Sequence, residues 1–373
     1  MLGAGLMSGT SLDGMDAAII ETDGVRVIRQ LGGMSLAYST AQRQVLERVV
    51  SDALQWKFIG PAPDSFTPAA ALLAEIGAEA IAQALKQTGL SSDHLEVIGF
   101  HGQTVLHAPP LVGINGQTCQ IGDANQLAKL TSCKIIHDFR SADMAIGGHG
   151  APLAPAWHFA LARLSGQSAM VFLNIGGVSN LTFIPAQASI AQMVAFDCGP
   201  GNGPIDAWVQ SKGKGTMDRD GAFAAQGQVD QTIVAEVLNK IPKPGRAASI
   251  DRWAFDHSPV LGLALEDGAA TLSEITAQAI ARGILALPER PEEVMVGGGG
   301  RYNPVLMERL QALVPCAILP CEAKGWNGDL IEAEAFAFLA IRRLAELPNS
   351  WPGTTGVSRP TVGGTICEPY DYS

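Results

Sequence analysis

Positive charge and aromatic side chains are scarce in this sequence. Its 373 residues include 25 Lys and Arg against 36 Asp and Glu, which gives a net charge of −11, and only 6% of the residues are aromatic. Because such an acidic protein repels a phosphate backbone, nucleic acid is excluded as a partner. An anionic ligand can bind only where backbone dipoles or a few local cations hold it.

Cysteine is sparse as well, and long apolar runs are missing. The six cysteines form no CxxC pair, and none has a histidine at zinc-finger spacing. A disulfide scaffold and a zinc module are therefore excluded, and we expect reduced thiols in a cytoplasmic protein. No run of about 18 apolar residues occurs, and the first ten residues contain no Lys or Arg. We therefore expect neither a membrane span nor a signal peptide.

The composition that is present fits a large α/β protein. Hydrophobic residues make up 47% of the chain and Gly occurs 42 times, which excludes disorder and is typical of helix-rich α/β folds with tight loops. An apolar run, a small glycine loop, a second apolar run and then helices occur in this order in both halves. We predict two domains, residues 1–140 and 141–349, with the tail from about 350 to 373 returning to the first.

Local signals predict where two long helices begin. An Ala- and Leu-rich helix is predicted over residues 68–87, with Thr67 as its N-cap. Thr271 and Glu274 have the spacing of a capping box, which predicts a helix that begins there and continues to about Leu287.

A glycine loop follows the first apolar run. Gly9 and Gly14 have the spacing of a P-loop, but Met15 and Asp16 stand where that motif needs Lys and Ser or Thr. Because a β-prone run follows instead of a helix, the P-loop interpretation is rejected. Two interpretations remain. The loop is an ordinary hairpin turn, or it offers N–H groups and hydroxyls to an anion, with Asp13 and Asp16 nearby for a hydrated Mg²⁺.

The second half contains two further loops of this kind. Residues 174–180 (NIGGVSN) repeat the pattern at the head of a second hairpin, and four glycines at 297–300 follow an apolar strand and lead into a helix at Asn303. Glycine lets a ligand approach the backbone closely, and a flat nucleoside fits against bare backbone. A single loop of this type is more often only a turn. Three of them, two at the heads of hairpins in separate halves, favour a nucleotide site.

Seven sequence blocks carry a resemblance to a known family. The blocks are MSGTSLDGMD, GFHGQTV, QIGDANQLA, HDFRSADMAIGGHGAPL, LNIGGVSNLT, FDCGPGNGPIDAW and VGGGGRYNP. In this order they resemble the anhydro-N-acetylmuramic acid kinases over nearly the whole chain. One departure is Cys198, which stands where the family usually has Thr after the Asp of the DxGPGN block. The change leaves the carboxylate in place and alters only its surroundings.

The resemblance implies a two-domain actin-like (ribonuclease H-like) ATPase fold with ATP in a cleft between the domains, and a homodimer. It implies ATP and Mg²⁺ as cofactors and a small amino sugar as substrate. Water would open the ring of 1,6-anhydro-N-acetylmuramic acid while ATP phosphorylates O6, in peptidoglycan recycling. Asp13 and Asp16 would hold Mg²⁺ through water. The implied cofactor-binding residues are Gly9, Thr10, Ser11, Leu12, Asp13, Gly14, Met15, Asp16, Gly176, Gly177, Asn180, Gly297, Gly298, Gly299 and Asn303.

Asp197 is the candidate catalytic base. It ends a short apolar strand ahead of a glycine turn and a helix start, where α/β proteins place catalytic groups, and it matches the general base of the family. From the residues alone, a role in capping the turn or the helix is favoured. One carboxylate suffices for ring opening, because the phosphate captures the departing bridge oxygen and no general acid is needed.

A second set of residues is predicted to bind the sugar. Arg140 can pair with the lactyl carboxylate in a bidentate manner, or it forms a surface ion pair with Asp138. His101 is a candidate partner for sugar hydroxyls, although a lone His is more often structural. Of Glu332, which matches an acidic family position, and Glu334, only one is expected to face the site. The full set is His101, Gln103, Asp123, Asp138, Arg140 and Glu332.

Three other functions remain open. A sugar kinase of the same fold would phosphorylate a hydroxyl without hydrolysing a bond. A nucleotide-switched scaffold ATPase would use closure to bind partners, and a metal-free glycosidase would act without ATP.

Overall fold

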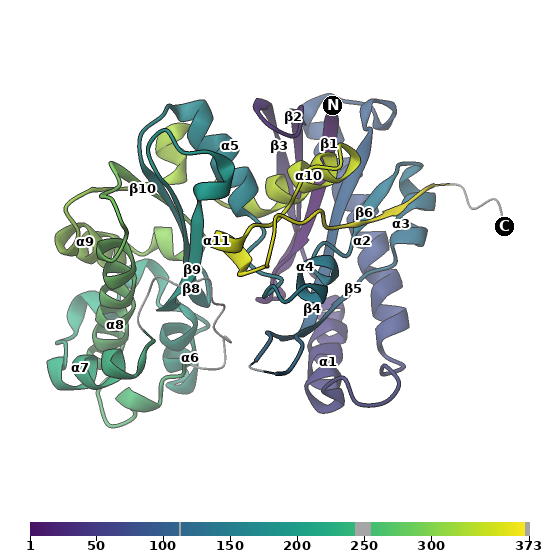
Figure 1. Cartoon of the computed structure of the whole chain (residues 1–373). Helices are drawn as coiled ribbons and strands as arrows, with labels where there is room; N and C mark the ends of the chain where they lie inside the picture. The colour runs from purple at the N-terminus through teal and green to yellow at the C-terminus, as the bar shows by residue number, and fades with distance from the viewer. Residues whose placement is uncertain (112, 243–254, 370–373) are drawn as a thin grey trace. The chain divides into compact units, whose positions relative to one another are not determined.

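The computed structural model describes residues 1–111, 113–242 and 255–369 (Figure 1). The chain forms two compact units. The first unit contains Met1–Ser165 and Asp329–Ser373, and the second unit contains Gly166–Gly328.

These divisions lie elsewhere than the predicted boundaries at 140 and 349. The first unit includes α4 (Ser141–Ala145) and α5 (Pro155–Ser165). The chain returns to this unit at Asp329, just before α10 (Ile331–Leu344). The physical reason is packing, since α10 contacts strands of the first sheet and α5 contacts α10. An apolar helix belongs to the unit whose sheet it covers, whatever its distance along the chain.

The first unit is built on a seven-stranded sheet. Its strand order is β12-β6-β4-β1-β2-β3, with β5 paired to β4. Strands β1, β2 and β3 form an antiparallel meander, whereas β4 is parallel to β1 and β6 is parallel to β4. The strands are β1 (Leu2–Ser8), β2 (Gly14–Thr22), β3 (Val27–Ala37), β4 (Val97–Ala108), β5 (Gln117–Ile121), β6 (Ile135–His137) and β12 (Thr365–Cys367).

The second unit repeats this topology with five strands. Its order is β11-β10-β7-β8-β9, with an antiparallel meander from β7 to β9 and with β10 and β11 parallel to β7. The strands are β7 (Met170–Ile175), β8 (Val178–Ile184), β9 (Val194–Pro200), β10 (Glu293–Gly297) and β11 (Ala317–Pro320). Two α/β units with the same ribonuclease H-like strand order confirm the predicted fold class.

The helices of the first unit cover its sheet, and one of them begins earlier than predicted. Helix α2 begins at Phe66 with Ser65 as N-cap residue, so the prediction that Thr67 is the N-cap was wrong. Pro68 still lies in the first turn, where its missing N–H costs no hydrogen bond. The remaining helices of this unit are α1 (Thr40–Trp56), α2 (Phe66–Thr88), α3 (Ala124–Thr131), α4, α5, α10 and α11 (Pro352–Thr355).

Helix α2 is also the one described helix that is long and apolar enough to cross a membrane by length and composition, and half of its most apolar window is buried. Its Leu73, Ala74 and Ile76 belong to the core of the first unit, and the helix contacts β2 and β3. This burial accounts for its apolar character as that of a core helix.

The helices of the second unit include one that the sequence misplaced. Helix α8 begins at Leu265, so Thr271 and Glu274 lie inside it and do not form a capping box. Both are buried and serve distant partners. The Thr271 hydroxyl accepts a hydrogen bond from the Asp230 backbone, and the Glu274 carboxylate pairs with Arg309. The helices are α6 (Gly203–Ser211), α7 (Gln231–Lys240), α8 (Leu265–Leu285) and α9 (Pro304–Leu313).

Short 3₁₀ helices connect the main elements of both units. They are η1 (Ser92–His94), η2 (Ile190–Gln192), η3 (Arg219–Gly221), η4 (Ala224–Gln226), η6 (Ser258–Val260), η7 (Gly299–Tyr302) and η8 (Cys321–Lys324).

Two glycines allow α10 to lie directly on the first sheet. A Cβ added at Gly5 of β1 would overlap the carbonyl oxygen of Ala333, and one added at Gly99 of β4 would overlap that of Phe336. Figure 1 shows α10 beside β1, in agreement with their contacts. This close approach fixes where the first turn of α10, with Glu332, meets the sheet.

The buried carboxyl of Glu334 joins α10 to two neighbouring elements. Only 2% of this residue is exposed. Gln30 on β3 donates its amide N–H to the carboxyl oxygens at 2.9 and 2.8 Å, and the Trp157 indole on α5 donates at 3.2 Å. Burial raises the pKa of Glu334 to about 7, although these hydrogen bonds oppose the shift.

Glu334→Gln should remove part of the pH dependence of stability. Because the folded state binds the proton more tightly, the contribution of Glu334 to the free energy of unfolding is complete below pH 4.5. This contribution is lost as the pH rises to about 7, and the free energy of unfolding falls by about 3 kcal/mol as a result. Urea unfolding curves from pH 4 to 8 measure it. The exposed Glu79→Gln serves as a control that should follow the wild-type profile. Equal profiles for all three proteins would contradict the assignment.

Candidate functional site

The first glycine loop connects β1 and β2. The hairpin register pairs Ser8 with Met15, which agrees with the rejection of a P-loop because a strand follows the loop. Ser8 donates its hydroxyl to the Gln103 amide oxygen at 2.5 Å and lies 2.6 Å from the Tyr38 hydroxyl. The loop is therefore anchored from inside the sheet, and Thr10 is exposed at its tip.

Some predicted cofactor-binding residues of this loop have buried side chains. Met15 is fully buried and Leu12 is 7% exposed, and both belong to the hydrophobic core. Leu12 has a φ of 56°, and its N–H bonds to the Gly9 carbonyl oxygen at 3.3 Å. These two residues can offer only backbone groups to a ligand, whereas Gly9, Thr10 and Ser11 remain accessible on the turn.

Carboxylates gather beside this loop. Burial raises the pKa of Asp16 to about 6, and the negative charges of Glu332, Asp13 and Asp329 add to the shift, against a hydrogen bond from Ser35. Such mutual repulsion favours a bound cation. Magnesium takes oxygen ligands and often uses only one or two carboxylates, with water and phosphate completing its shell. Among the described residues no group of three or more candidate ligands has metal-binding geometry.

Three of the predicted sugar-binding residues, His101, Arg140 and Glu332, come together beside the middle of β4. The Arg140 guanidinium donates to His101 Nε2, with Nη2 at 2.9 Å and Nε at 3.3 Å, and its Nη1 donates to the Gly150 carbonyl oxygen at 2.6 Å. Burial lowers the pKa of Arg140 to about 10, while the charge of Glu332 opposes this. Arg140 therefore stays cationic at neutral pH, next to Glu332 and His101.

His101 is held as a neutral imidazole. It is 4% exposed, and burial together with the charge of Arg140 lowers its pKa well below the ordinary value. Because Nε2 accepts from Arg140, the proton lies on Nδ1, which donates to the Gly102 carbonyl oxygen at 2.8 Å. The ring also packs on Phe336 of α10, with 4.6 Å between ring centroids. His101 thus orients Arg140.

Two other predicted sugar-binding residues have local roles. Asp123 is the N-cap of α3 and accepts a hydrogen bond from the Gln126 backbone at 2.9 Å. Asp138 accepts from the Ser141 backbone and hydroxyl at 3.3 and 2.6 Å. Both carboxylates thus stabilise helix starts. The alternative of a surface ion pair between Asp138 and Arg140 is not favoured, because Arg140 bonds to His101 and Gly150.

Two polar residues near Arg140 were not predicted from the sequence, the half-buried His107 and the buried Asp143. His107 lies on β4, where burial and the charge of Arg140 lower its pKa to about 4. Asp143 on α4 is 1% exposed. The second histidine of the segment VIGFHGQTVLHA was a detectable signal for His107. Nothing local marks Asp143, since its partners are distant in sequence.

The three glycine-rich segments of the second unit lie together at the carboxyl ends of β7, β9 and β10. The Gly201 N–H bonds to the Gly177 carbonyl oxygen at 3.0 Å, and the Asn202 N–H bonds to the Gly176 carbonyl oxygen at 2.7 Å. Gly298 has a φ of 72°, and a Cβ there would overlap the backbone that ends β7. Bare backbone from three loops therefore forms one surface.

Asp197 lies on β9 at this same end of the sheet. It pairs across the strands with Asn180 of β8, next to a register shift, so these two predicted residues are neighbours. The strand continues to Pro200, three residues further than predicted, and α6 begins at Gly203 with Asn202 as N-cap residue. Asp197 therefore does not cap that helix.

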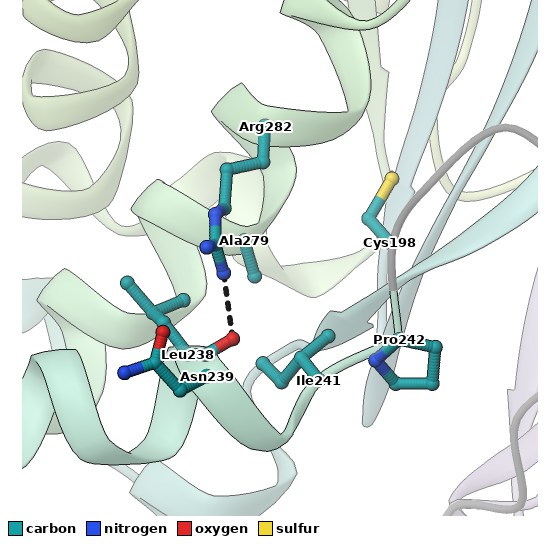
Figure 2. Close-up of a pocket in the computed structure, with 7 residues that line it drawn as sticks. All are labelled: Cys198, Leu238, Asn239, Ile241, Pro242, Ala279 and Arg282. Carbon is teal, nitrogen blue, oxygen red and sulfur yellow. Dashed lines mark hydrogen bonds between the residues drawn. The ribbon is translucent and has the colours of Figure 1, made fainter.

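Cys198 faces the opposite side of β9 from Asp197. Successive side chains alternate along a strand, and Cys198 is 3% exposed within the core of the second unit. Figure 2 shows it at a cavity of about 170 Å³. Arg282 lies across that cavity and donates to the Leu238 carbonyl oxygen at 2.6 Å. Burial, with the nearby charge of Asp197, raises the pKa of the Cys198 thiol. The thiol is therefore neutral, and its contribution is to packing.

The third loop is held by two residues of its own segment. Arg301 is 6% exposed and donates from Nη1 to the Gly298 carbonyl oxygen at 2.8 Å, and it also pairs with Glu322. Asn303 is the N-cap of α9, and its side-chain oxygen accepts from the Leu306 backbone at 3.2 Å. The predicted cofactor-binding Asn303 therefore has a structural role in placing the loop. Arg301 was not predicted from the sequence.

Gly177→Ala tests whether the loop surface binds triphosphate. A Cβ at Gly177 would meet no protein atom within 4 Å, so the thermal midpoint should stay unchanged. The methyl group would occupy space that a phosphate needs, and ATP affinity should fall by about tenfold or more. Calorimetric titration measures the affinity. Gly262→Ala, which also meets no atom within 4 Å, should bind ATP normally. Unchanged ATP affinity in Gly177→Ala would refute this use of the loop.

Comparison with known proteins identifies the family. The family model described as anhydro-N-acetylmuramic acid kinase matches residues 1–369. Curated relatives with this name include one from Phenylobacterium zucineum, 44% identical over 98% of this chain and 99% of the relative. Another, from Rhizobium rhizogenes, is 44% identical over 98% of both chains. A third, from Caulobacter vibrioides, is 43% identical over 97% of both.

Solved structures show weaker likeness. The activator of 2-hydroxyisocaproyl-CoA dehydratase from Clostridium difficile has a TM-score of 0.44 and 11% identity, covering 93% of this chain and 96% of that one. A ROK family glucokinase from Streptomyces griseus has a TM-score of 0.42 and 11% identity, covering 91% and 99%. The assignment rests on the family model and on the sequence relatives, which extend over nearly the full length. The chain belongs to the anhydro-N-acetylmuramic acid kinase family.

Proposed function

We propose that this protein uses ATP to phosphorylate O6 of 1,6-anhydro-N-acetylmuramic acid while water opens the anhydro ring. The products are N-acetylmuramic acid 6-phosphate and ADP, which places the reaction in peptidoglycan recycling. The observation that carries this proposal is the family match over residues 1–369, together with relatives that bear the name of this kinase.

The first unit supplies the groups that suit an acidic sugar. Arg140 presents a planar cation, and a guanidinium binds a carboxylate best through two parallel hydrogen bonds. It is the natural partner of the lactyl carboxylate of muramic acid. The neighbouring Glu332 suits a sugar hydroxyl or the N-acetyl group. Gln103 is fully buried, and its amide is bonded to Ser8 and to the Thr104 carbonyl oxygen, so its role is to support the first glycine loop. Asp123 and Asp138, which stabilise helix starts, are left with a supporting role.

The glycine loops suit the triphosphate. Residues 9–11 of the first unit and Gly177 of the second offer backbone N–H groups, and the segment at 297–299 offers flat backbone to the nucleoside. The Gly176 N–H already donates to the Val178 carbonyl oxygen at 3.2 Å. Asp13 and Asp16 would hold Mg²⁺ through water. The ion neutralises charge on the phosphates when bound. The side chains of Met15 and Leu12 take no part, because they lie in the core.

Asp197 is proposed as the general base. It takes a proton from water as the water oxygen bonds to carbon 1 and the bond from carbon 1 to O6 breaks. The electron pair of that bond stays on O6, which bonds to the γ-phosphorus as ADP departs. Because phosphate captures O6, no second carboxylate has to donate a proton. This balance explains how one carboxylate serves where an inverting glycosidase uses two.

The protein is proposed to act as a cytoplasmic homodimer, as the family resemblance implies. The six cysteines are all thiols in the structure, which suits a reducing compartment.

An isotope experiment tests the double reaction. The protein, Mg-ATP and the anhydro sugar are incubated in ¹⁸O-labelled water, and the product is examined by mass spectrometry. We expect one phosphate and one ¹⁸O at carbon 1 in the same product molecule. Phosphate without label would indicate a sugar kinase that hydrolyses nothing. Label without phosphate would indicate a glycosidase, and ATP hydrolysis with unchanged sugar a scaffold ATPase. Each of these three results refutes the proposal.

Asp197→Asn should abolish turnover while ATP still binds, because the amide cannot accept the proton from water. We expect kcat to fall by about 10³-fold or more. Asp230→Asn is a matched control in the same unit, since Asp230 caps α7 and Asn caps a helix equally well. The control should keep wild-type kcat. Substantial activity in Asp197→Asn, measured by coupled ADP release, would assign the base elsewhere.

A further inference from the structure

The segment after α10 reaches back to α4 through one buried hydrogen bond. Thr355 on α11 is fully buried, and its hydroxyl donates to Asp143 Oδ2 at 2.6 Å. Asp143 is itself 1% exposed. A buried bond to a carboxylate is among the stronger hydrogen bonds of a protein. The end of the chain is therefore fastened to a helix that lies 212 residues earlier.

The same carboxylate holds the loop that follows α4. Asp143 Oδ1 accepts from the Gly150 N–H at 2.7 Å, and the Asp143 carbonyl oxygen accepts from the Gly148 N–H at 3.0 Å. The intervening His149 N–H donates to the Thr355 carbonyl oxygen at 2.8 Å. Asp143 and Thr355 thus form hydrogen bonds with three successive residues, 148–150. Gly150 has a φ of 69°, a conformation that favours glycine.

These hydrogen bonds determine the direction of the Gly150 carbonyl group. The Gly150 carbonyl oxygen accepts from Arg140 Nη1 at 2.6 Å, while Nη2 and Nε of the same guanidinium contact His101 Nε2. The guanidinium plane is therefore fixed from two sides. His101 fixes one side, and the other depends on Gly150, which in turn depends on Asp143 and Thr355.

We propose that Asp143 and Thr355 are positioning residues that set the plane of Arg140 for a carboxylate on the sugar. The proposal rests on the proposed function, in which Arg140 binds the lactyl carboxylate. Bidentate pairing demands that guanidinium and carboxylate share a plane, so a small rotation of Arg140 removes one of the two hydrogen bonds. The C-terminal segment would in this way contribute to recognition of the acidic sugar without touching it.

The experiment compares Thr355→Val, which keeps the side-chain shape and removes the hydroxyl, with Thr355→Ser, which restores it. We expect Thr355→Val to raise the KM for the anhydro sugar by about tenfold, while the KM for ATP stays the same and Thr355→Ser behaves as wild type. Thr361→Val is the matched control, because its hydroxyl bonds only within the exposed part of the same segment, to the Arg359 carbonyl oxygen at 2.8 Å. It should leave both KM values unchanged.

A double-mutant cycle separates positioning from general stabilisation. If Thr355 acts through Arg140, then adding Thr355→Val to Arg140→Lys should change the sugar KM by less than about twofold, since the bidentate fork is already lost. Additive effects, or an equal rise in the KM for ATP, overturn the proposal. Should Thr355→Val not fold, Asp143→Asn enters the same cycle with the same expectation. Absence of sugar phosphorylation by the wild type would instead refute the proposed function.

Discussion

Direct contact between the backbone of α10 and the first sheet is the constraint on which the first unit depends. Gly5 and Gly99 leave no Cβ between the strands and the helix, so α10 lies closer to β1 and β4 than larger residues would permit. Its first turn then carries Glu332 to the carboxylates beside Asp16 and to Arg140. The same helix buries Glu334 against other elements. Adjacent acidic residues of one helix therefore have different roles.

An acidic protein that binds an acidic sugar and a triphosphate has to concentrate its attraction for anions. The net charge of −11 opposes both ligands at long range. At the proposed site the attraction would come from one guanidinium with fixed orientation, from backbone N–H groups and from a cation that the repelling carboxylates would favour. These are short-range interactions, and burial strengthens each of them. Correct orientation of a few donors thus replaces an extended positive surface.

Predictions from the sequence were right for features that local patterns encode. They were wrong where contacts between residues distant in the sequence determine the structure. Hairpins and glycine loops followed from apolar runs and Gly spacing. The division of the chain was misplaced because α10 packs on strands from the other end of the sequence. Thr271 and Glu274 have the spacing of a capping box, but their hydrogen-bond and ion-pair partners are Asp230 and Arg309. Asp143 carried no local signal, because only its contacts with Gly150 and Thr355 reveal it.

The departure at Cys198 is best understood from the alternation of side chains along β9. Asp197 and Cys198 are consecutive, so one faces the glycine loops and the other faces the core. A Thr at position 198 would bring its hydroxyl into the core and the cavity of Figure 2 and would not bring it to the carboxylate. A buried neutral thiol fills that space as a small hydrophobic group. The exchange therefore acts on packing behind the strand, and the proton chemistry proposed for Asp197 does not depend on it.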